Sequence, residues 1–342
     1  MDKRGFTITL LAIVLFVTYL WWSNPFQAFS ELESFSLNLF VIAIIVDFIG
    51  LFFFVFSWHL LNKALDIKIE LWESIQICFT SLFVGWIVPI PMNTEVVRAY
   101  LLTNKTGSNM GKSISSVFVH RAFYNISFGI IITLTAFFVI LSGKQIPIKS
   151  EIVVFLVFFA IISSIFFSLI LNPRILERLY SLSPNWIKHN IFDRLYNPDK
   201  SEAGFKRVIF EVEEAIITLS KKMKLSLLSF ICVSIHWGLG AITAWIVAYS
   251  MGVHLEIWVT VFIYAVIEFI QQINWVIPSG LGIVDTGLTE ALVFIGIPLS
   301  LSAAISLLIR FATNWIELIV YIPVAFHYGY KEIVEKLKSN VE

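Results

Sequence analysis

A forty-residue stretch occurs twice in this chain, and this repeat constrains the fold more than any other feature of the sequence. Residues 86–125 align without a gap to residues 275–314, at an offset of 189 positions. Only six of the forty pairs are identical. The matches fall on tryptophan, proline, glycine, serine, arginine and asparagine, and several of these are scarce in apolar sequence. We therefore interpret the chain as two related halves.

The composition places this repeat in a membrane. Hydrophobic residues make up 58% of the 342 residues and charged residues 14%, whereas a soluble domain carries about a quarter charged residues. Several apolar runs approach or exceed the roughly 20 residues that cross a bilayer as a helix. We expect an all-α integral membrane protein with an uncleaved first span. About six full crossings are expected, at roughly 6–22, 36–62, 113–142, 150–171, 223–250 and 299–328.

Two further apolar runs, 70–103 and 257–296, contain Pro and Gly near their middles. Their second arms, 94–103 and 283–296, span only about 15–20 Å as helix, roughly half of the hydrocarbon core. Broken helices are tolerated at membrane depth only where protein or a water-filled cavity satisfies the freed backbone groups. We interpret both runs as re-entrant helical hairpins, each of which returns to the side from which it started.

The distribution of basic residues supports this interpretation. If both runs turn back, 20 of the 24 Lys and Arg residues lie on one side of the membrane, and only Lys144 and Lys149 lie on the other. Such a bias marks cytoplasmic ends, so both termini are expected in the cytoplasm, with the protein in the cell membrane. The first repeat, 1–149, and the second, 150–342, are then inverted relative to each other, as in many transporters.

The second repeat carries a polar insert at 172–222. Over 205–219, apolar residues recur at helical spacing, and charged residues lie on the opposite face. This pattern predicts an amphipathic helix that lies in the cytoplasmic interface. A helix that binds a partner protein is the alternative.

Two arginines, Arg121 and Arg310, occupy equivalent positions of the repeats and lie near the bilayer midplane. Ionisable groups at this depth are functional candidates by default. A guanidinium group suits phosphate because it donates two parallel hydrogen bonds and keeps its proton. We therefore interpret the two arginines as anion ligands, one in each half. The alternative is a structural ion pair with an acid, for which the candidates are Asp47, Glu95, Glu268 and Glu317.

The tip of the first hairpin is a second kind of anion site. A half-helix is expected to begin at Thr94 with Asn93 as its cap, and Glu95 and Arg98 follow on the same helix. Free backbone N–H groups and the positive end of the helix dipole would face a ligand at mid-membrane depth. The alternatives are an ordinary kink and, for Glu95 and Arg98, an ion pair with each other.

The tip of the second hairpin precedes a half-helix that is expected to begin near Ile283. Glycine lets a ligand approach the backbone closely, so Ser279, Gly280 and Gly282 are candidate ligand contacts. Asp285 follows on this half-helix, which has no matching arginine of its own. An ordinary kink is again the alternative.

Two further polar groups lie within apolar runs. Asp47 and His236 are paired by the same offset of 189, and either is a candidate carrier of a coupling proton, since histidine titrates near neutral pH. The alternative for both is a hydrogen-bonded structural role. Glu268 and Gln272, with Gln271, form a cluster at helical spacing that either lines a polar cavity for a head group or fastens the second hairpin.

Two motifs carry a resemblance to a known family. Residues 91–102, PMNTEVVRAYLL, and residues 278–285, PSGLGIVD, resemble the first and second motifs of the lysylphosphatidylglycerol synthase transmembrane, or flippase, family. Asp285 stands where that family usually has Glu, and Arg310 matches its arginine in the last crossing. The resemblance covers nearly the whole chain. It implies a stand-alone membrane form, without the aminoacyl-transferase half, that moves a polar-headed phospholipid between leaflets.

Residues and resemblance together predict a flippase-like or scramblase-like transporter of a polar or anionic phospholipid, or of a polyprenyl-phosphate-linked lipid. The alternatives are a small-anion transporter or channel and a membrane-embedded lipid-modifying transferase, for which the sequence has no catalytic cluster. We expect no enzyme activity, no cofactor, no metal and no nucleic-acid partner. The expected partner is a membrane lipid substrate, and a homodimer is an open option.

Overall fold

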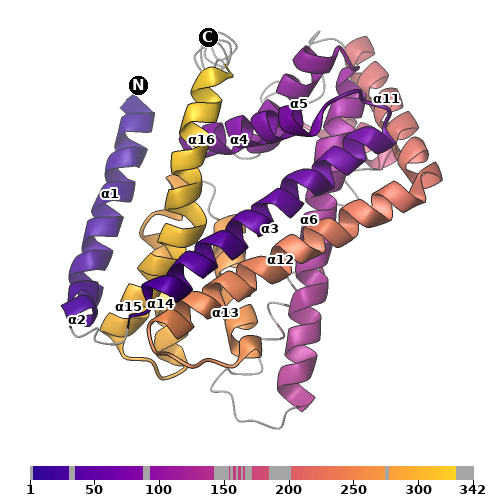
Figure 1. Ribbon diagram of the computed structural model, residues 1–342. Helices are drawn as coiled ribbons and strands as arrows, with labels where there is room; N and C mark the ends of the chain where they lie inside the picture. Colours follow the sequence, from indigo (N-terminus) through magenta and orange to yellow (C-terminus); the bar gives the residue numbers. More distant parts are fainter. Residues whose placement is uncertain are drawn as a thin grey trace.

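All regular structure in the described part of the chain is helical, as the ribbon of this computed structural model shows (Figure 1). The structure describes residues 3–30, 35–87, 93–141, 172–184, 202–273 and 277–328, with scattered positions between 154 and 165. The predicted crossing at 150–171 falls almost wholly outside the described residues, as do the first hairpin tip at 88–92 and the C-terminal end of the chain.

Four helices of the described residues are long and apolar enough to cross a membrane. Three are uninterrupted: α3 (Leu37–Ala64), α6 (Met110–Leu141) and α12 (Met223–Ser250). The fourth runs through α15 (Leu299–Arg310), the π-helical turn η3 (Phe311–Trp315) and α16 (Ile316–His327). A shorter apolar helix, α1 (Lys3–Ser23), leads into α2 (Pro25–Ser30). The prediction of an all-α membrane protein is confirmed.

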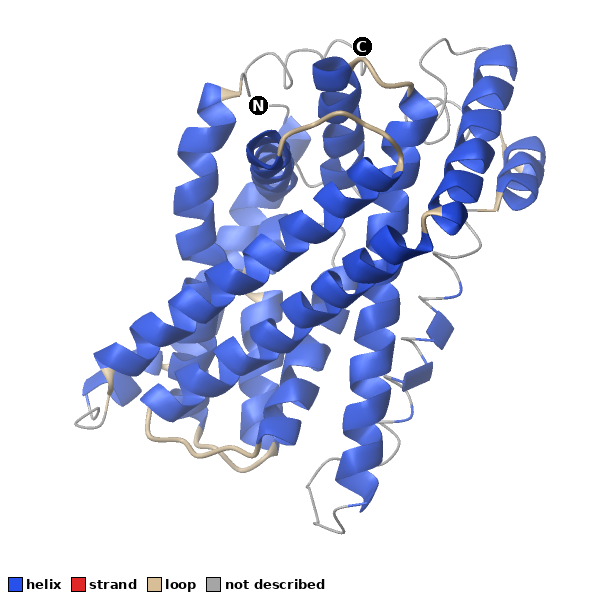
Figure 2. Ribbon diagram, turned by 45° about the vertical axis from the view of Figure 1, so that its right-hand side comes forward, coloured by secondary structure: helices blue, strands red, loops and turns tan. Residues whose placement is uncertain are grey.

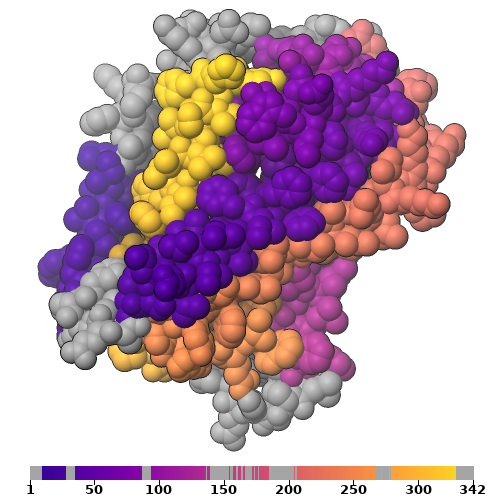
Figure 3. All heavy atoms as spheres, in the orientation of Figure 1, coloured from indigo at the N-terminus to yellow at the C-terminus, as the bar shows by residue number. Residues whose placement is uncertain are grey.

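Helices α3 and α12 lie side by side and run in opposite directions across the molecule (Figures 1 and 2). At one end, the backbone N–H of Ser36 donates to the carbonyl of Ser250 at 2.8 Å. At the other end, Lys222 Nζ lies 2.6 Å from Asp66, and this exposed hydrogen bond lowers the pKa of the Asp66 carboxyl. Their side chains form two adjacent bands across the front face of the space-filling view (Figure 3).

Small residues allow this close contact. The hydroxyl groups of Ser57 and Ser229 each donate to the other's backbone carbonyl at 2.8 Å. Seven residues before Ser57, the carbonyl of Gly50 accepts a hydrogen bond from His236 Nδ1 at 3.0 Å. Small buried residues recur on α3 at this spacing, at Ala43, Gly50, Ser57 and Ala64. A period of seven keeps one face of a helix against an antiparallel neighbour, and small residues at that face let the backbones approach.

The first predicted hairpin consists of α4 (Leu71–Ile87) and α5 (Asn93–Thr106), which pack against each other. Near their outer ends, Lys105 Nζ forms an ion pair with Glu73 at 2.9 Å. The two arms therefore begin and end at the same end of the molecule, and α5 covers the predicted second arm, 94–103.

The second predicted hairpin consists of α13 (Ile257–Ile273), a 3-10 turn, η2 (Pro278–Gly280), and α14 (Ile283–Phe294). Leu255, before α13, and Ile297, after α14, lie in the same apolar cluster. These arms also begin and end at one end of the molecule, the end at which Ser36 meets Ser250. Helix α14 begins at Ile283, as predicted.

The two halves exchange contacts through the first arms of the hairpins. Helix α4 packs against α16, the last described helix of the second half, and α13 packs against α6 of the first half. The rings of Trp86 on α4 and Trp315 on η3 meet edge to face, with centroids 5.7 Å apart. The second arms, α5 and α14, pack instead on the helices that follow them, α6 and α15.

The polar insert contains α8 (Pro173–Leu182) and α11 (Glu202–Lys221). The apolar stripe predicted over 205–219 packs on the protein itself. Four of its residues are buried in the largest apolar cluster of the described residues: Val208, Ile209, Val212 and Leu219. The reason is a close approach to α6, where Glu211 Oε2 accepts from the backbone N–H of Gly111 at 2.8 Å.

Candidate functional site

A cavity of about 240 Å³ lies between the two halves of the chain. Its walls come from α3, α4, α6, α12, α13, α14 and the α15–η3–α16 helix. The ionised or ionisable side chains that line it, apart from tyrosines, are Asp47, Arg121, His236, Arg310 and Glu317. Four of these were predicted as site residues from separate apolar runs, and the tertiary structure brings them to one chamber.

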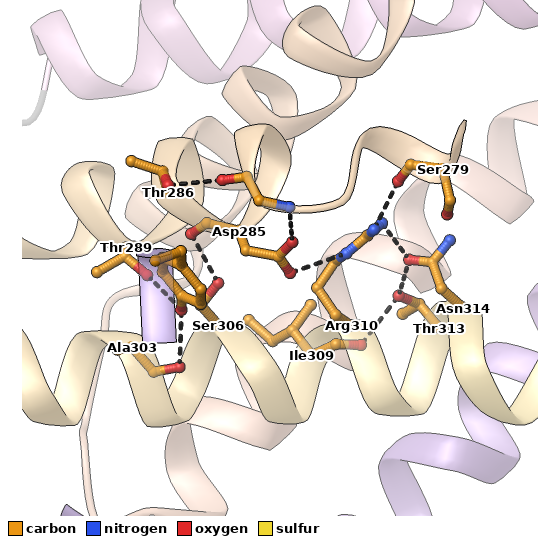
Figure 4. A network of polar contacts seen from close by, with 12 residues as sticks. Ser279, Asp285, Thr286, Thr289, Ala303, Ser306, Ile309, Arg310, Thr313 and Asn314 are labelled. Carbon is orange, nitrogen blue, oxygen red and sulfur yellow. Dashed lines mark hydrogen bonds and ion pairs between the residues drawn. The ribbon is translucent and has the colours of Figure 1, made fainter. Parts of the chain in front are cut away.

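Arg310 is fixed in the wall of this cavity by three hydrogen bonds (Figure 4). Its Nε donates to Asp285 Oδ1 at 3.2 Å, its Nη1 to Asn314 Oδ1 at 2.8 Å, and its Nη2 to the carbonyl of Ser279 at 2.6 Å. The side chains of Arg310 and Asp285 are each only 2% exposed. The structural alternative for Arg310 therefore holds, with an acid outside the predicted set of partners. Asp285 does have a matching arginine, supplied by the next helix.

The backbone groups of the second hairpin tip are contacted by other parts of the same chain. Oδ2 of Asp285 accepts from the backbone N–H of Gly282 at 2.8 Å, so the carboxylate occupies the positive end of α14 (Figure 4). A Cβ at Gly282, whose φ is 80°, would lie 2.8 Å from the backbone of Leu15 and 2.9 Å from that of Phe16. The close approach predicted for a ligand at Gly282 is thus made by α1. Ser279 adopts φ of 53°, which directs its carbonyl to Arg310.

Arg121 is held more loosely than Arg310. Its Nε lies 3.7 Å from Glu95 Oε1, beyond hydrogen-bonding distance, and its side chain is 33% exposed. The guanidinium carbon lies 5.2 Å from the centroid of the Tyr124 ring, a cation–π contact. The acid on α5 thus pairs with the arginine on α6, as Asp285 on α14 pairs with Arg310 on α15. The predicted alternative of a Glu95 pair with Arg98 is not the arrangement observed.

Each of the two arginines is followed four residues later by an asparagine. Asn125 Nδ2 donates to the backbone carbonyl of Arg121 at 2.8 Å, whereas Asn314 Oδ1 accepts from the guanidinium of Arg310. Asn314 lies in η3, whereas Asn125 lies in regular α-helix. A π-helical turn inserts one residue into the helix, redirects the side chains that follow, and is frequent at functional sites. The two halves therefore differ at this point.

Arg98 lies outside the cavity. It is buried, with Nε donating to Ser81 Oγ at 3.3 Å and Nη1 lying 3.4 Å from His120 Nδ1. Its guanidinium carbon is 5.3 Å from the ring centroid of Phe54 and 5.4 Å from that of Trp58. Phe54 also lines the cavity. Arg98 therefore supports the cavity wall from behind an aromatic ring.

Asp47 is buried, and both it and Glu317 line the cavity. Its Oδ2 is buried and has no hydrogen-bonding partner among the described residues. The hydroxyl of Tyr321 donates to Glu317 Oε2 at 2.6 Å. His236 lines the same cavity, but its Nδ1 is bonded to the Gly50 carbonyl, which gives it a structural role in the α3–α12 contact.

Glu317 is the site residue that sequence reasoning missed, because it was considered only as an ion-pair partner for an arginine. The spacing between Glu317 and Arg310 is the sequence feature that could have identified this residue. Glu317 follows Arg310 by seven residues, a spacing that places two side chains on one face of a regular helix. An acid on the same face as a buried arginine, in an apolar run, points to a shared polar chamber.

The remaining predicted residues of the first tip are only partly described. Thr94 packs against α4 at Gly85, where an added Cβ would collide with the threonine hydroxyl. Asn93 is the first residue of α5, one position earlier than predicted, and its side chain lies outside the described part.

The predicted polar cluster on α13 is likewise described in part. Gln271 lines the cavity, as the head-group alternative predicts. The side chains of Glu268 and Gln272 lie outside the described residues. Gly280, in the second tip, is buried and has φ of 64°. In the described part of the chain, no three His, Cys, Asp or Glu side chains are grouped so as to hold a metal ion.

These features define a multi-pass helical membrane protein with a polar cavity lined by helices from distant parts of the chain. Residues 9–320 match the family described as the lysylphosphatidylglycerol synthase TM region, and the chain therefore belongs to that family. The predicted resemblance is confirmed.

Three relatives are described as UPF0104 membrane proteins. One, from Pyrococcus horikoshii, is 17% identical over 92% of this chain and 94% of its own length. Two further relatives come from Methanothermobacter thermautotrophicus. One is 23% identical over 96% of this chain and 94% of its own length. The other is 19% identical over the full length of both chains. No solved structure matches the chain.

Proposed function

We propose that this protein moves a phosphate-bearing lipid between the leaflets of the cell membrane. The head group passes through the cavity while the tails stay in the bilayer. The substrate class is an anionic or polar phospholipid, or a polyprenyl-phosphate-linked lipid. The observation that supports this most directly is a polar cavity with a partly exposed arginine, Arg121, inside a bundle of apolar helices.

The packing of the helices supports an inverted repeat. Under the repeat, α3 corresponds to α12, and these two helices run antiparallel in direct contact. The α4–α5 hairpin opens to the end of the molecule that carries Asp66 and Lys222, and the α13–α14 hairpin opens to the opposite end. Two halves that open to opposite sides around one central site are the arrangement that alternating access requires.

The polarity of the two ends supports the orientation. The described end that carries 65–70, 104–112 and 221–224 is rich in lysine, whereas 35–36, 251–256 and 295–298 at the opposite end contain neither lysine nor arginine. The basic end belongs in the cytoplasm by the positive-inside rule. Both termini are then cytoplasmic, with the α4–α5 hairpin entering from that side.

The two arginines have different roles in this proposal. Arg310 donates hydrogen bonds to Asp285, Asn314 and Ser279, and these bonds hold the second hairpin tip. Arg121 is the phosphate ligand, because its contact with Glu95 is long and its guanidinium reaches the cavity. A guanidinium can bind phosphate through two parallel hydrogen bonds.

Translocation of a labelled anionic phospholipid by the purified protein in liposomes tests this function. Vesicles of neutral phospholipid with a trace of head-group-intact, tail-labelled phosphatidylglycerol would be bleached by an impermeant reductant. We expect the bleached fraction to rise from about half to nearly all when folded protein is present. Chloride and phosphate efflux would be measured from the same vesicles.

The outcome separates the proposed function from its alternatives. Lipid translocation without anion efflux supports the proposal. Efflux of small anions without lipid movement would instead show that the protein is a small-anion channel or transporter. Conversion of the labelled lipid to a new product would establish a transferase.

A further inference from the structure

Asp47 on α3 and Glu317 on α16 both line the cavity. Two carboxyl groups in one largely apolar cavity favour a proton on one of them, because two carboxylates there repel each other. The contacts decide which group carries the proton. Glu317 accepts the hydroxyl of Tyr321 at 2.6 Å, and an ionised carboxylate is the better acceptor.

The environment of Asp47 fits the neutral acid. Its Oδ2 is buried and has no hydrogen-bonding partner among the described residues. A buried carboxylate with an unsatisfied oxygen is strongly destabilised, whereas the carbonyl oxygen of a protonated acid tolerates that position far better. Of the two carboxyl groups, Asp47 is therefore the one whose surroundings better suit a bound proton.

The other ionisable groups around this pair come from every neighbouring helix. Those that face the cavity are Arg121, paired with Glu95, Arg310, paired with Asp285, and His236, bonded to Gly50. Cys78 of α4 lies near Tyr321 and Glu317. The side chain of Glu268 on α13 is outside the described residues. Among these groups, Arg121 is the cation whose acidic partner is held at a long distance.

We propose that Asp47 binds and releases a proton in step with the lipid phosphate, and that Glu317 holds the protonated form in place. This inference rests on the proposed function and gives its coupling ion. When phosphate binds Arg121, the negative charge added to the cavity favours a proton on Asp47. When phosphate leaves, Arg121 again favours the Asp47 carboxylate, and the proton passes to water on the side to which the cavity is open.

The thermodynamic linkage between proton binding and lipid binding fixes the direction in which lipid affinity changes with pH. A ligand whose binding takes up one proton binds more tightly as the pH falls, by up to about tenfold per pH unit over the range in which Asp47 titrates. If proton and lipid move together, a pH difference across the membrane drives the lipid. The lipid then accumulates in the leaflet that faces the higher pH, because protons flow toward that side.

The experiment imposes a pH difference of one unit on proteoliposomes that contain the labelled phosphatidylglycerol, with valinomycin and equal potassium holding the membrane potential at zero. The final distribution of label between leaflets is measured. Wild-type protein is expected to give an enrichment of up to about tenfold on the alkaline side, which corresponds to one proton per lipid. Protein-free vesicles should keep an even distribution.

Three variants distinguish the proton site from general effects on the protein. Asp47→Asn, which cannot titrate, is expected to abolish the enrichment. Glu317→Gln is expected to reduce it, because Gln is a weaker acceptor for the Asp47 proton. Asp66→Asn, the same change on α3's exposed end beside Lys222, should keep the wild-type enrichment.

Wild-type protein that exchanges lipid but shows no enrichment would overturn the inference and leave the proposed function standing. Enrichment that persists in Asp47→Asn would overturn it as well. If folded wild-type protein exchanges no lipid, the proposed function itself fails. If Asp47→Asn does not fold, the wild-type distribution and Glu317→Gln decide the matter.

Discussion

Arg310 and Asp285 form a buried ion pair, with Nε and Oδ1 3.2 Å apart, between the helix after the second hairpin and the second arm of that hairpin. The same carboxylate caps α14 through the Gly282 N–H. Arg121 and Glu95 repeat this relationship in the first half at 3.7 Å, with far more exposure. The protein thus has one short, buried ion pair of this kind and one that is longer and more exposed. The first two predictions follow from this difference.

Arg310→Gln is expected to destabilise the protein before transport is affected. The change leaves Asp285 as a buried carboxylate without its cation, at a cost of about 3–5 kcal/mol. Thermal melting in detergent should show a clear loss of stability and yield. The double change Arg310→Gln with Asp285→Asn removes both charges and should recover most of the melting temperature. If Arg310→Gln melts normally, the ion pair does not hold the hairpin tip.

Arg121→Gln is expected to behave in the opposite way. Glu95 is already 14% exposed and only loosely paired, so its stranded charge costs much less, and the melting temperature should stay near that of the wild type. Lipid translocation should stop, because the phosphate loses its bidentate donor. Arg121→Lys should restore little activity, since an ammonium keeps the charge but not the planar fork. Normal translocation by Arg121→Gln would remove Arg121 from the site.

Gly282→Ala is expected to displace α1 from the second hairpin tip. The added Cβ would lie 2.8 Å from the backbone of Leu15, and the residue would also carry the cost of a positive φ. Gly296→Ala is the matched control, because Gly296 has φ of 95° and nothing within 4 Å of the added atom. The control should lose about 1–2 kcal/mol from the backbone alone. Equal losses in the two variants would mean that α1 does not pack on Gly282.

Ser57→Leu tests the contact between α3 and α12. Ser57 is fully buried against Ser229, and a larger side chain there forces the two backbones apart. A loss of about 1–3 kcal/mol is expected from overpacking. Ile49→Phe, which adds volume on the exposed face of the same helix, should change stability by less than about 0.5 kcal/mol. Melting of both variants in detergent gives the comparison.

Cysteine accessibility tests the inverted topology. Cysteine at Asn104, near the end of α5, should react with an impermeant thiol reagent only after cells are permeabilised. Cysteine at His254, between α12 and α13, should react in intact cells. The native Cys78 and Cys232 are both buried and should stay silent. Labelling of position 104 from outside would show that the first hairpin crosses the membrane, and the inverted repeat would fail.

Much of this architecture was predictable from the sequence because it depends on local properties. The lengths of the apolar runs predict the helices, and the Pro and Gly residues at their centres predict where α4–α5 and α13–α14 break. The spacing of the repeat predicts that Arg121 and Arg310 occupy equivalent positions. The contact face of α3 was also predictable, since the small residues Ala43, Gly50 and Ser57 recur at a period of seven.

The sequence by itself determined the class of protein, the helical hairpins and the polar residues that lie within apolar helices. The tertiary structure alone decided that Asp285 pairs with Arg310 and Glu95 with Arg121, and that Asp47 and Glu317 line the same cavity. It also decided that the apolar stripe of α11 faces α6 and that α1 covers Gly282. The physical reason is that lipid tails and a protein core are equally apolar. Hydrophobic periodicity in a membrane helix therefore does not distinguish the lipid face from the packed face, and ion pairs between distant segments form only once the helices have packed.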